Sequence, residues 1–244
     1  MKRELKKQIK QDEVLTGFAQ AVKWTRAHER EARMGGLAVV VLAVASYGLY
    51  YYRTHRARAG TEAFAAAVEI YHAPVAGTSE AAQQPGVTTY PSNAEKMGKA
   101  VAAFDDVAKR YGSLSVGWRA RYYAALCRAE LGQLPQAEKE LSELALRRDA
   151  EALEPSLARL ALADVQRRSG QLDKAVQTYR QAVEDQTFRL PHDYALMLLA
   201  ATLEEAHRPD EAGASYRRLT QEFPGSVYAS EARQRAAYLS TAQG

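Results

Sequence analysis

Apolar and polar positions divide this chain of 244 residues into three stretches with different patterns. Residues 34–52, MGGLAVVVLAVASYGLYYY, form the longest run without a charged side chain. Before it, residues 1–33 carry apolar side chains at helical spacing among basic ones. After it, residues 59–244 show a helical pattern punctuated by glycine and proline, without persistent strand-like alternation. The pattern predicts an all-α protein.

The apolar run has the length of a membrane span. As a helix, residues 34–52 would extend about 28 Å, close to the thickness of a bilayer core. The run ends in Tyr50, Tyr51 and Tyr52, side chains that suit the membrane interface. The long leader before the run and the bulky tyrosines at its end argue against a cleaved signal peptide, although residues 57–59, Ala-Arg-Ala, resemble a cleavage site. We therefore expect a single transmembrane helix over 34–52, followed by a basic juxtamembrane stub over 53–58.

Charge is distributed unevenly about this run. Residues 1–33 carry nine Lys or Arg against five Asp or Glu, whereas residues 59–244 carry 21 bases against 24 acids. Three further arginines lie in the stub. This bias favours a cytoplasmic N-terminus and an extracytoplasmic repeat domain. Because the basic excess lies beside the apolar run, it also argues against nucleic-acid binding.

The leader, residues 1–33, is a basic amphipathic segment. Leu5, Ile9, Leu15, Phe18 and Val22 recur at helical spacing among lysines and arginines. One interpretation is a cytoplasmic helix that rests on the inner leaflet. The other is a helix that binds a partner next to the span. The sequence leaves both open.

The region after the span contains an internal repeat. LGQLPQAEKELSEL (131–144), SGQLDKAVQTYRQA (169–182) and HRPDEAGASYRRL (207–219) align without gaps on small, aromatic and apolar positions, and a fourth unit lies one period earlier. The aligned triplets are Ala100, Phe104 and Val107; Ala137, Leu141 and Leu144; Ala175, Tyr179 and Ala182; and Ala212, Tyr216 and Leu219. The pattern resembles the tetratricopeptide repeat, a helix-turn-helix unit, with Gly132 and Gly170 in the turns.

This resemblance predicts a divergent tetratricopeptide-repeat-like (TPR-like) solenoid over 59–244. The first unit would pair helices 61–72 and 94–111 across an irregular loop, 73–93. Longer turns are expected around 149–155 and 187–191. A terminal capping helix is expected over 226–239, with Arg233 and Arg235 on a solvated outer face.

Catalytic patterns do not emerge from the sequence. Five histidines lie in separate segments without metal-ligand spacing, and the one cysteine, Cys127, lies in an apolar helical stretch that suits a buried residue. Phosphate-binding loops and nucleophile motifs are not recognised. We therefore expect a protein that is not an enzyme and uses no metal, cofactor or small-molecule substrate.

The first helices of such an array line a concave surface that can bind an extended or helical peptide. The register set by Gly132 gives twelve candidate groove residues, apolar or aromatic at the centre and charged at the edges. They are Arg119, Tyr122, Leu126 and Glu130; Leu157, Leu160, Asp164 and Arg168; and Tyr194, Met197, Ala201 and Glu205. Several leucines could instead pack between repeats.

The architecture is similar to that of YfgM-like ancillary subunits of the bacterial Sec translocon. The likeness rests on the leader QDEVLTGFAQAVKW, the span with its aromatic exit and basic stub, and the repeats. It implies a single-pass protein of the bacterial inner membrane whose periplasmic domain binds chaperones and exported chains beside translocon subunits. A local likeness, EFPGSVYASEAR (222–233), points to repeat proteins of envelope assembly and division. A structural envelope scaffold and a regulatory adaptor acting through the leader therefore remain alternatives.

Overall fold

The computed structural model describes residues 27–79, 86–147 and 153–241. Within these ranges the chain is all-helical, and the chain divides into two compact units, residues 1–56 and 57–244. The described helices are α2 (Glu29–His72), α4 (Asn93–Tyr111), α5 (Ser115–Glu130), α6 (Leu134–Ala145), α7 (Glu154–Arg168), α8 (Leu172–Glu184), α9 (His192–Glu205), α10 (Pro209–Glu222) and α11 (Ala229–Thr241). Most of the predicted leader, residues 1–26, lies outside the described residues.

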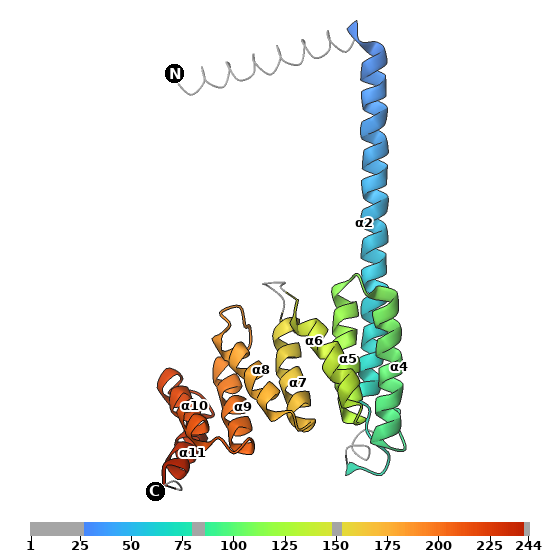
Figure 1. Cartoon of the computed structure of the whole chain (residues 1–244). Coiled ribbons are helices and arrows are strands. Elements are labelled where there is room, and N and C mark those ends of the chain that lie inside the picture. The colour runs from blue at the N-terminus through green and yellow to red at the C-terminus, as the bar shows by residue number, and fades with distance from the viewer. Residues whose placement is uncertain (1–26, 80–85, 148–152, 242–244) are drawn as a thin grey trace, which may run out of the picture. The chain divides into compact units, whose positions relative to one another are not determined.

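Helix α2 contains the apolar run and continues without a break through the basic stub (Figure 1). The described part of the first unit therefore consists of the beginning of this helix, up to Arg56. Large apolar side chains of the run are exposed, from 54% at Leu49 to 71% at Tyr47. Among the described residues, α2 is the one helix long and apolar enough to cross a membrane.

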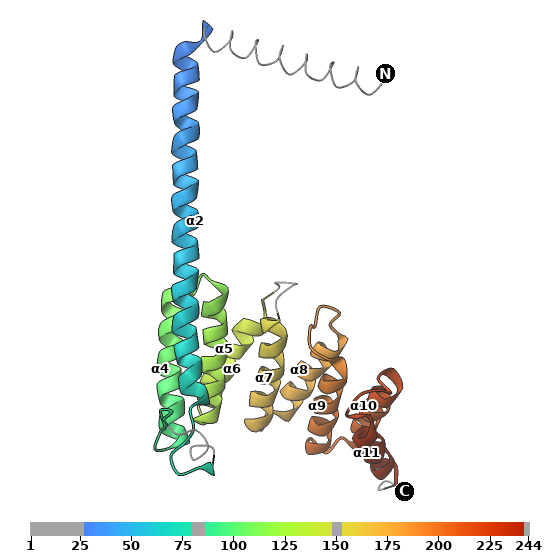
Figure 2. The ribbon, with the colours of Figure 1, turned by 180° about the vertical axis from the view of Figure 1, so that it is seen from behind.

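The second unit is an array of antiparallel helix pairs, which Figures 1 and 2 show from opposite sides. The last part of α2 packs with α4, and the following pairs are α5 with α6, α7 with α8, and α9 with α10, closed by α11. All twelve residues of the four aligned triplets are at most 3% exposed, which confirms the repeat register. The small residue of each triplet allows close helix contact, and the larger ones fill the space between neighbours.

The turn inside each of the last three repeats has the same backbone geometry. Gly132 and Gly170 have φ of 75° and 74°, and His207 has φ of 55° at the equivalent position. In each turn, the N–H one residue later bonds back to a carbonyl of the preceding helix, as from Gln133 to Arg128 at 2.9 Å. This is the Schellman arrangement, in which a left-handed residue ends a helix. Glycine takes that conformation without strain, whereas histidine does not.

The first repeat differs from the others in its connection between helices. Within its described parts, Val75 and Tyr90 form an isolated parallel bridge. The Ala76 N–H donates to the Tyr90 carbonyl at 2.8 Å, and the Tyr90 N–H donates to the Pro74 carbonyl at 3.2 Å. The ends of the segment expected as an irregular loop are therefore paired with each other.

The terminal helix α11 begins at Ala229, later than the predicted start at Ser226. The Ser226 hydroxyl donates to Asp193 at 2.6 Å and accepts the Tyr228 N–H at 3.1 Å. These bonds hold Ser226 in a turn beside the start of α9. The expectation for Arg235 was also incomplete, because its guanidinium binds the Glu204 carboxylate at 2.5 Å instead of facing only solvent.

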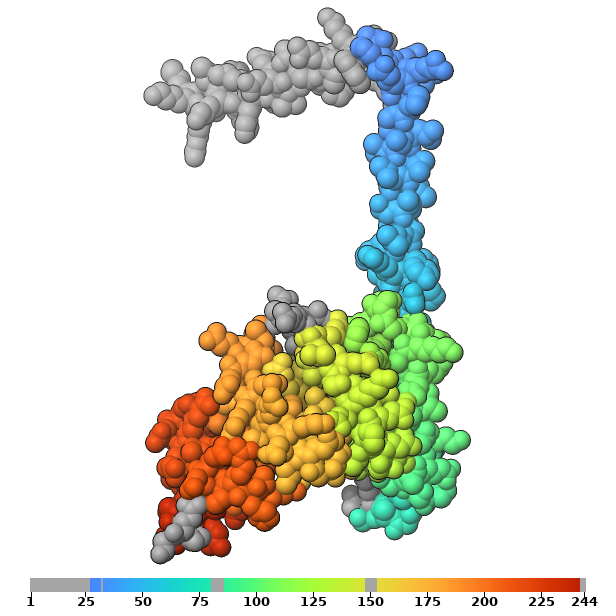
Figure 3. Space-filling model, in the orientation of Figure 1, coloured from blue at the N-terminus to red at the C-terminus, as the bar shows by residue number. Residues whose placement is uncertain are grey.

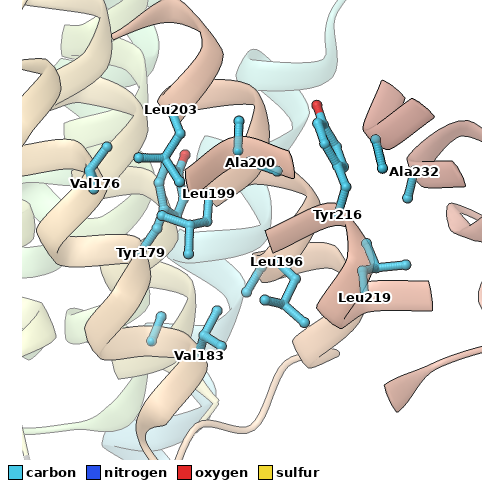
Figure 4. Packing of buried hydrophobic residues seen from close by; sticks show 14 of the residues in the cluster. Val176, Tyr179, Val183, Leu196, Leu199, Ala200, Leu203, Tyr216, Leu219 and Ala232 are labelled. Carbon is cyan, nitrogen blue, oxygen red and sulfur yellow. The ribbon is translucent and has the colours of Figure 1, made fainter. Parts of the chain in front are cut away.

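Buried side chains form a continuous series of clusters along the array. Figure 4 shows the C-terminal cluster, and Figure 3 shows side chains filling the gaps between neighbouring helices on one face. The residues labelled in the close-up are Val176, Tyr179 and Val183 of α8; Leu196, Leu199, Ala200 and Leu203 of α9; Tyr216 and Leu219 of α10; and Ala232 of α11. This packing fixes the first helices that carry the predicted groove residues.

Candidate functional site

The twelve predicted groove residues lie on α5, α7 and α9, the first helices of three successive repeats. The side chains at the apolar centre are half-buried, except those of Tyr194, which is 38% exposed, and Ala201, which is also exposed. Tyr122, Leu160 and Met197 also pack against the core clusters. These three side chains therefore stabilise the array as well as forming part of its surface.

Charged residues at the ends of these helices pair with one another across repeats. Arg168 of α7 donates to the Glu130 carboxylate of α5 at 3.0 Å and to the Ala129 carbonyl at 2.8 Å. Its neighbour Arg167 binds Glu205 of α9 at 3.2 Å. The contact between Arg168 and the Ala129 carbonyl places a cation at the C-terminus of α5, where the helix dipole favours positive charge. These pairs join three first helices along one edge of the surface.

The opposite edge has a further link between α5 and α7. There the Arg119 guanidinium lies 3.3 Å from the Glu154 carboxylate. Four of the five charged residues predicted for the groove edges, Arg119, Glu130, Arg168 and Glu205, thus take part in contacts between first helices. The fifth, Asp164, accepts a hydrogen bond from Arg167 within α7 at 2.8 Å. A bound peptide would have to compete with these pairs or bind between them.

Tyr122, at the centre of the surface, has a raised pKa. Burial, followed by the influence of Tyr123, Tyr71 and Tyr194, raises the pKa of Tyr122 to about 12. Its hydroxyl therefore remains protonated near neutral pH and can donate a hydrogen bond as well as accept one.

A buried ion pair that sequence reasoning missed joins the first two repeats. Arg128 is 6% exposed, and its guanidinium binds Asp105 of α4 at 2.6 Å and Glu140 of α6 at 2.8 Å. Burial raises the pKa of Glu140 against the opposing effect of Arg128. In the next repeat, Gln166 accepts a 2.8 Å hydrogen bond from Thr178. Gln166 and Thr178 lie about one repeat period after Arg128 and Glu140. The spacing could therefore have suggested that a polar pair joins the two helices at this position of the repeat.

The end of the first repeat carries a cleft of about 420 Å³. It lies between the last turns of α2 and the returning connection, and mixes apolar with polar side chains. Its lining consists of Ala66, Glu69, Ile70, His72, Ala73, Val87, Thr88 and Tyr90. Groups of three or more potential metal ligands do not occur among the described residues.

Helix pairs that share one register, with a surface formed by their first helices, define a helical repeat protein of the tetratricopeptide class. The chain belongs to the tetratricopeptide repeat-like domain family, whose profile matches residues 29–193. A second profile, described as tetratricopeptide repeat, matches residues 160–227. Such repeats are protein–protein interaction scaffolds, and that is the general class of this chain.

Solved structures share the same fold. A candidate kinesin light chain of Podosopora anserina with nearly identical TPR-like repeats superposes with a TM-score of 0.51 at 17% identity, covering 62% of this chain and 80% of that chain. A point variant of that protein gives a TM-score of 0.51 at 16% identity, with the same coverage. A search of curated proteins finds no match. At this identity the likeness establishes the fold alone.

Proposed function

We propose that the chain is a single-pass membrane-anchored scaffold, with residues 34–52 in the bilayer and the repeats as its interaction domain. The observation that carries the proposal is the exposure of the apolar run: Val41 and Leu42 are 57% and 65% exposed. Burying one such side chain is worth about 1.5–3 kcal/mol. A bilayer would bury the whole run, and the run has the length that a bilayer requires.

The side of the membrane follows from the charge bias. The excess of Lys and Arg before the run supports a cytoplasmic leader and an extracytoplasmic, periplasmic repeat domain. Within this topology we propose that the repeats bind exported proteins or their chaperones beside the Sec translocon of a bacterial inner membrane. The support is the resemblance in architecture: a basic leader, one apolar run and a divergent repeat array.

The proposed binding surface is the first-helix face of α5, α7 and α9. Tyr194 is accessible there, and its ring lies 5.7 Å from that of Tyr228. Half-buried Tyr122 adds a second aromatic surface. Aromatic side chains with polar tips are common at the energetic centres of protein interfaces. A peptide segment would find apolar contact and hydrogen-bond donors on the same surface.

Affinity purification from mildly solubilised membranes tests the assignment to the translocon. A C-terminally tagged chain should recover translocon subunits together with periplasmic chaperones, and exchange of residues 34–52 for an unrelated span should weaken translocon recovery. Recovery of envelope-assembly or division proteins without translocon subunits would contradict this assignment and favour a structural scaffold.

Crosslinking tests the binding surface itself. A photocrosslinking residue at Tyr194 should capture exported chains, and Tyr122→Phe should reduce the capture because it removes a hydroxyl while keeping the ring packed. The matched control places the same crosslinker at Tyr238 of α11, which is 62% exposed. Equal capture at both positions would show that the first-helix face has no special role.

A further inference from the structure

Polar side chains occupy the same position in three successive repeats, between the first helix and the second. The pairs are Arg128 with Glu140 at 2.8 Å, Gln166 with Thr178 at 2.8 Å, and Glu204 with Tyr216 at 2.7 Å. The members of each pair are 12 residues apart, and the pairs recur at a constant interval. The position is therefore shared, whereas its chemistry changes from a cation with an acid, to two neutral groups, to an acid with a phenol.

The apolar side chains of the array do not distinguish one repeat from the next. Each second helix buries a small residue and two larger or apolar ones at the same spacing, as Ala137, Leu141 and Leu144 do in α6. Stacking that depended on this shared pattern alone would allow one repeat to pack in the place of another. The apolar pattern therefore does not fix the order in which the repeats stack.

A further position on the second helices varies in charge. It follows the small residue of each triplet at a fixed distance and holds Asp105 in α4, Ser142 in α6, Arg180 in α8 and Arg217 in α10. In α4 this residue reaches the next repeat, because Asp105 accepts a hydrogen bond from the buried Arg128 at 2.6 Å. Of these second helices, only α4 carries an acid at this position.

Across each boundary between repeats, this second-helix residue matches the polar residue of the following first helix in charge. The order along the chain is Asp105 before Arg128, Ser142 before Gln166, and Arg180 before Glu204. The boundaries thus run from acid to base, from neutral to neutral, and from base to acid. Direct bonding is seen at the first boundary. At the last, Arg180 binds Glu211 of α10, and Glu204 binds Arg235 of α11 at 2.5 Å.

A different order of repeats would bring like charges together. If α5 followed α8 instead of α4, Arg128 would face Arg180. If α9 followed α4, Glu204 would face Asp105. Like charges in a partly buried contact are unfavourable, and a buried guanidinium that loses its acid is costly. In the natural order, every buried side-chain polar atom of the described residues has a hydrogen-bond partner.

We propose that these polar residues determine which repeats stack on one another: Asp105 selects the repeat that carries Arg128, and the neutral and reversed boundaries disfavour the other orders. The apolar pattern supplies most of the stability, and the polar positions supply the order. The same selection opposes out-of-order stacking of a repeat from a second copy of the chain. It acts within residues 57–244 and is independent of the membrane attachment and the binding surface proposed above.

Charge reversal at the first boundary tests whether the sign of the neighbour matters. Asp105→Asn removes the attraction to Arg128, whereas Asp105→Arg adds a repulsion at the same site. In denaturant unfolding of the full chain in detergent micelles, Asp105→Arg should lower the folding equilibrium constant by about tenfold more than Asp105→Asn does. The charge-reversed set, Asp105→Arg with Arg128→Glu and Glu140→Gln, copies the base-to-acid boundary and should recover most of that loss. Equal losses from the two single variants, or no recovery, would overturn the proposal.

Refolding tests the choice of neighbour itself. The neutral set, Asp105→Ser with Arg128→Gln and Glu140→Thr, copies the residues of the second boundary, so that two boundaries become alike. The full chain is refolded from denaturant into detergent micelles at several protein concentrations and separated by size-exclusion chromatography with light scattering. The natural chain should give one main species throughout. The neutral set should give additional slowly refolding or larger species, whose fraction grows with concentration, at the same helix content by circular dichroism.

The matched control is Arg128→Lys, which keeps the charge and should refold like the natural chain. A neutral set that refolds to one species as completely as the natural chain would overturn the proposal. If the neutral set does not fold, the charge-reversed set takes its place, because it also makes two boundaries alike and should misassemble in the same way. Failure of both sets to fold would overturn the proposal too, because the position would then not accept the residues of another repeat.

Discussion

The apolar run and the repeat array bury hydrophobic side chains in different ways. Val41 in the run is 57% exposed, although it lies in the same helix as Ala67, which is 1% exposed. Ala67 lies against the core of the first repeat, whereas no described part of the chain covers Val41. One helix thus contains a segment buried by its own protein and an exposed apolar segment that, in the function proposed above, is buried by a lipid bilayer. Substitutions in the two segments should therefore have separable effects.

The largest effect is expected from charges placed in the run. Val41→Arg with Val44→Arg should raise the free energy of membrane insertion by about 5–7 kcal/mol, because each arginine near the centre of a span costs ~2.5–3.5 kcal/mol. The chain should then be found outside the membrane fraction with its repeats still folded. Flotation in a density gradient measures the first result, and circular dichroism the second. Val41→Leu with Val44→Leu is the matched control and should float like the natural chain.

A substitution in the core of the array should destabilise the repeats without releasing the chain from the membrane. Phe104 is fully buried, and its ring lies 5.3 Å from that of Tyr123 and 5.7 Å from that of Phe64. Phe104→Ala should lower the free energy of unfolding by about 3–5 kcal/mol, as large cavities do. Denaturant unfolding in detergent micelles provides the measurement. Tyr47→Ala, at a side chain 71% exposed, should leave that free energy unchanged; an equal loss from both would contradict the comparison.

A smaller effect separates two glycines of α2. A side chain at Gly60 would meet Val116 and Tyr111, whereas nothing lies within 4 Å of a Cβ at Gly48. Gly60→Leu should therefore destabilise the array by about 1–3 kcal/mol through overpacking. Gly48→Leu should have no such effect. Thermal unfolding of the two variants compares their stabilities. Equal melting temperatures would show that α2 does not pack closely at Gly60.

Turn glycines give a test within the array alone. Gly132 has φ of 75° and His207 has φ of 55°, and a side chain in this region costs about 1 kcal/mol or more. Gly132→Ala should lower the free energy of unfolding by about 1 kcal/mol, and His207→Gly should raise it by about 0.5 kcal/mol, since flexibility in the unfolded chain offsets part of the gain. Denaturant midpoints provide the measurement. Changes of the same sign would contradict the equivalence of the two turns.

The smallest effect is a pH dependence at the connection between α8 and α9. Hydrogen bonds from Thr187 and then Arg159 lower the pKa of Asp185 from 3.8 to about 2. A lowered carboxyl pKa stabilises the folded state above the ordinary pKa, and this contribution is lost as pH falls from 3.8 towards 2. The advantage of the natural chain over Asp185→Asn should therefore shrink across that interval. Unfolding midpoints at about pH 5 and about pH 2.5 measure it; a constant difference would refute the assignment.

The repeat register could be predicted because it depends on side-chain size at regular spacing. Ala137, Leu141 and Leu144 have a fixed relation within one helix, so their burial follows from local sequence. The turns at Gly132 and Gly170 were predictable for the same reason. His207 was not recognised as their equivalent in conformation, because histidine rarely adopts positive φ.

Contacts between the first helices of successive repeats could not be predicted from the sequence. The pairs Glu130 with Arg168 and Arg167 with Glu205 depend on how successive first helices are placed side by side. Pattern analysis gave Glu130, Arg168 and Glu205 as groove edges without indicating these pairs, and it did not single out Arg167. The late start of α11 likewise depends on Ser226 meeting Asp193 of another helix. Periodicity gives the buried face of a helix, but polar pairing across repeats requires the packed structure.

Protease protection tests the central account most directly, because it reports the span and the topology together. A chain with an N-terminal tag is expressed in bacteria, and protease is added outside spheroplasts whose inner membrane is intact. The account predicts a protected, membrane-bound tagged fragment that ends soon after Tyr52, with the repeat domain digested. A chain released whole into the supernatant, or a repeat domain protected inside the cell, would contradict it.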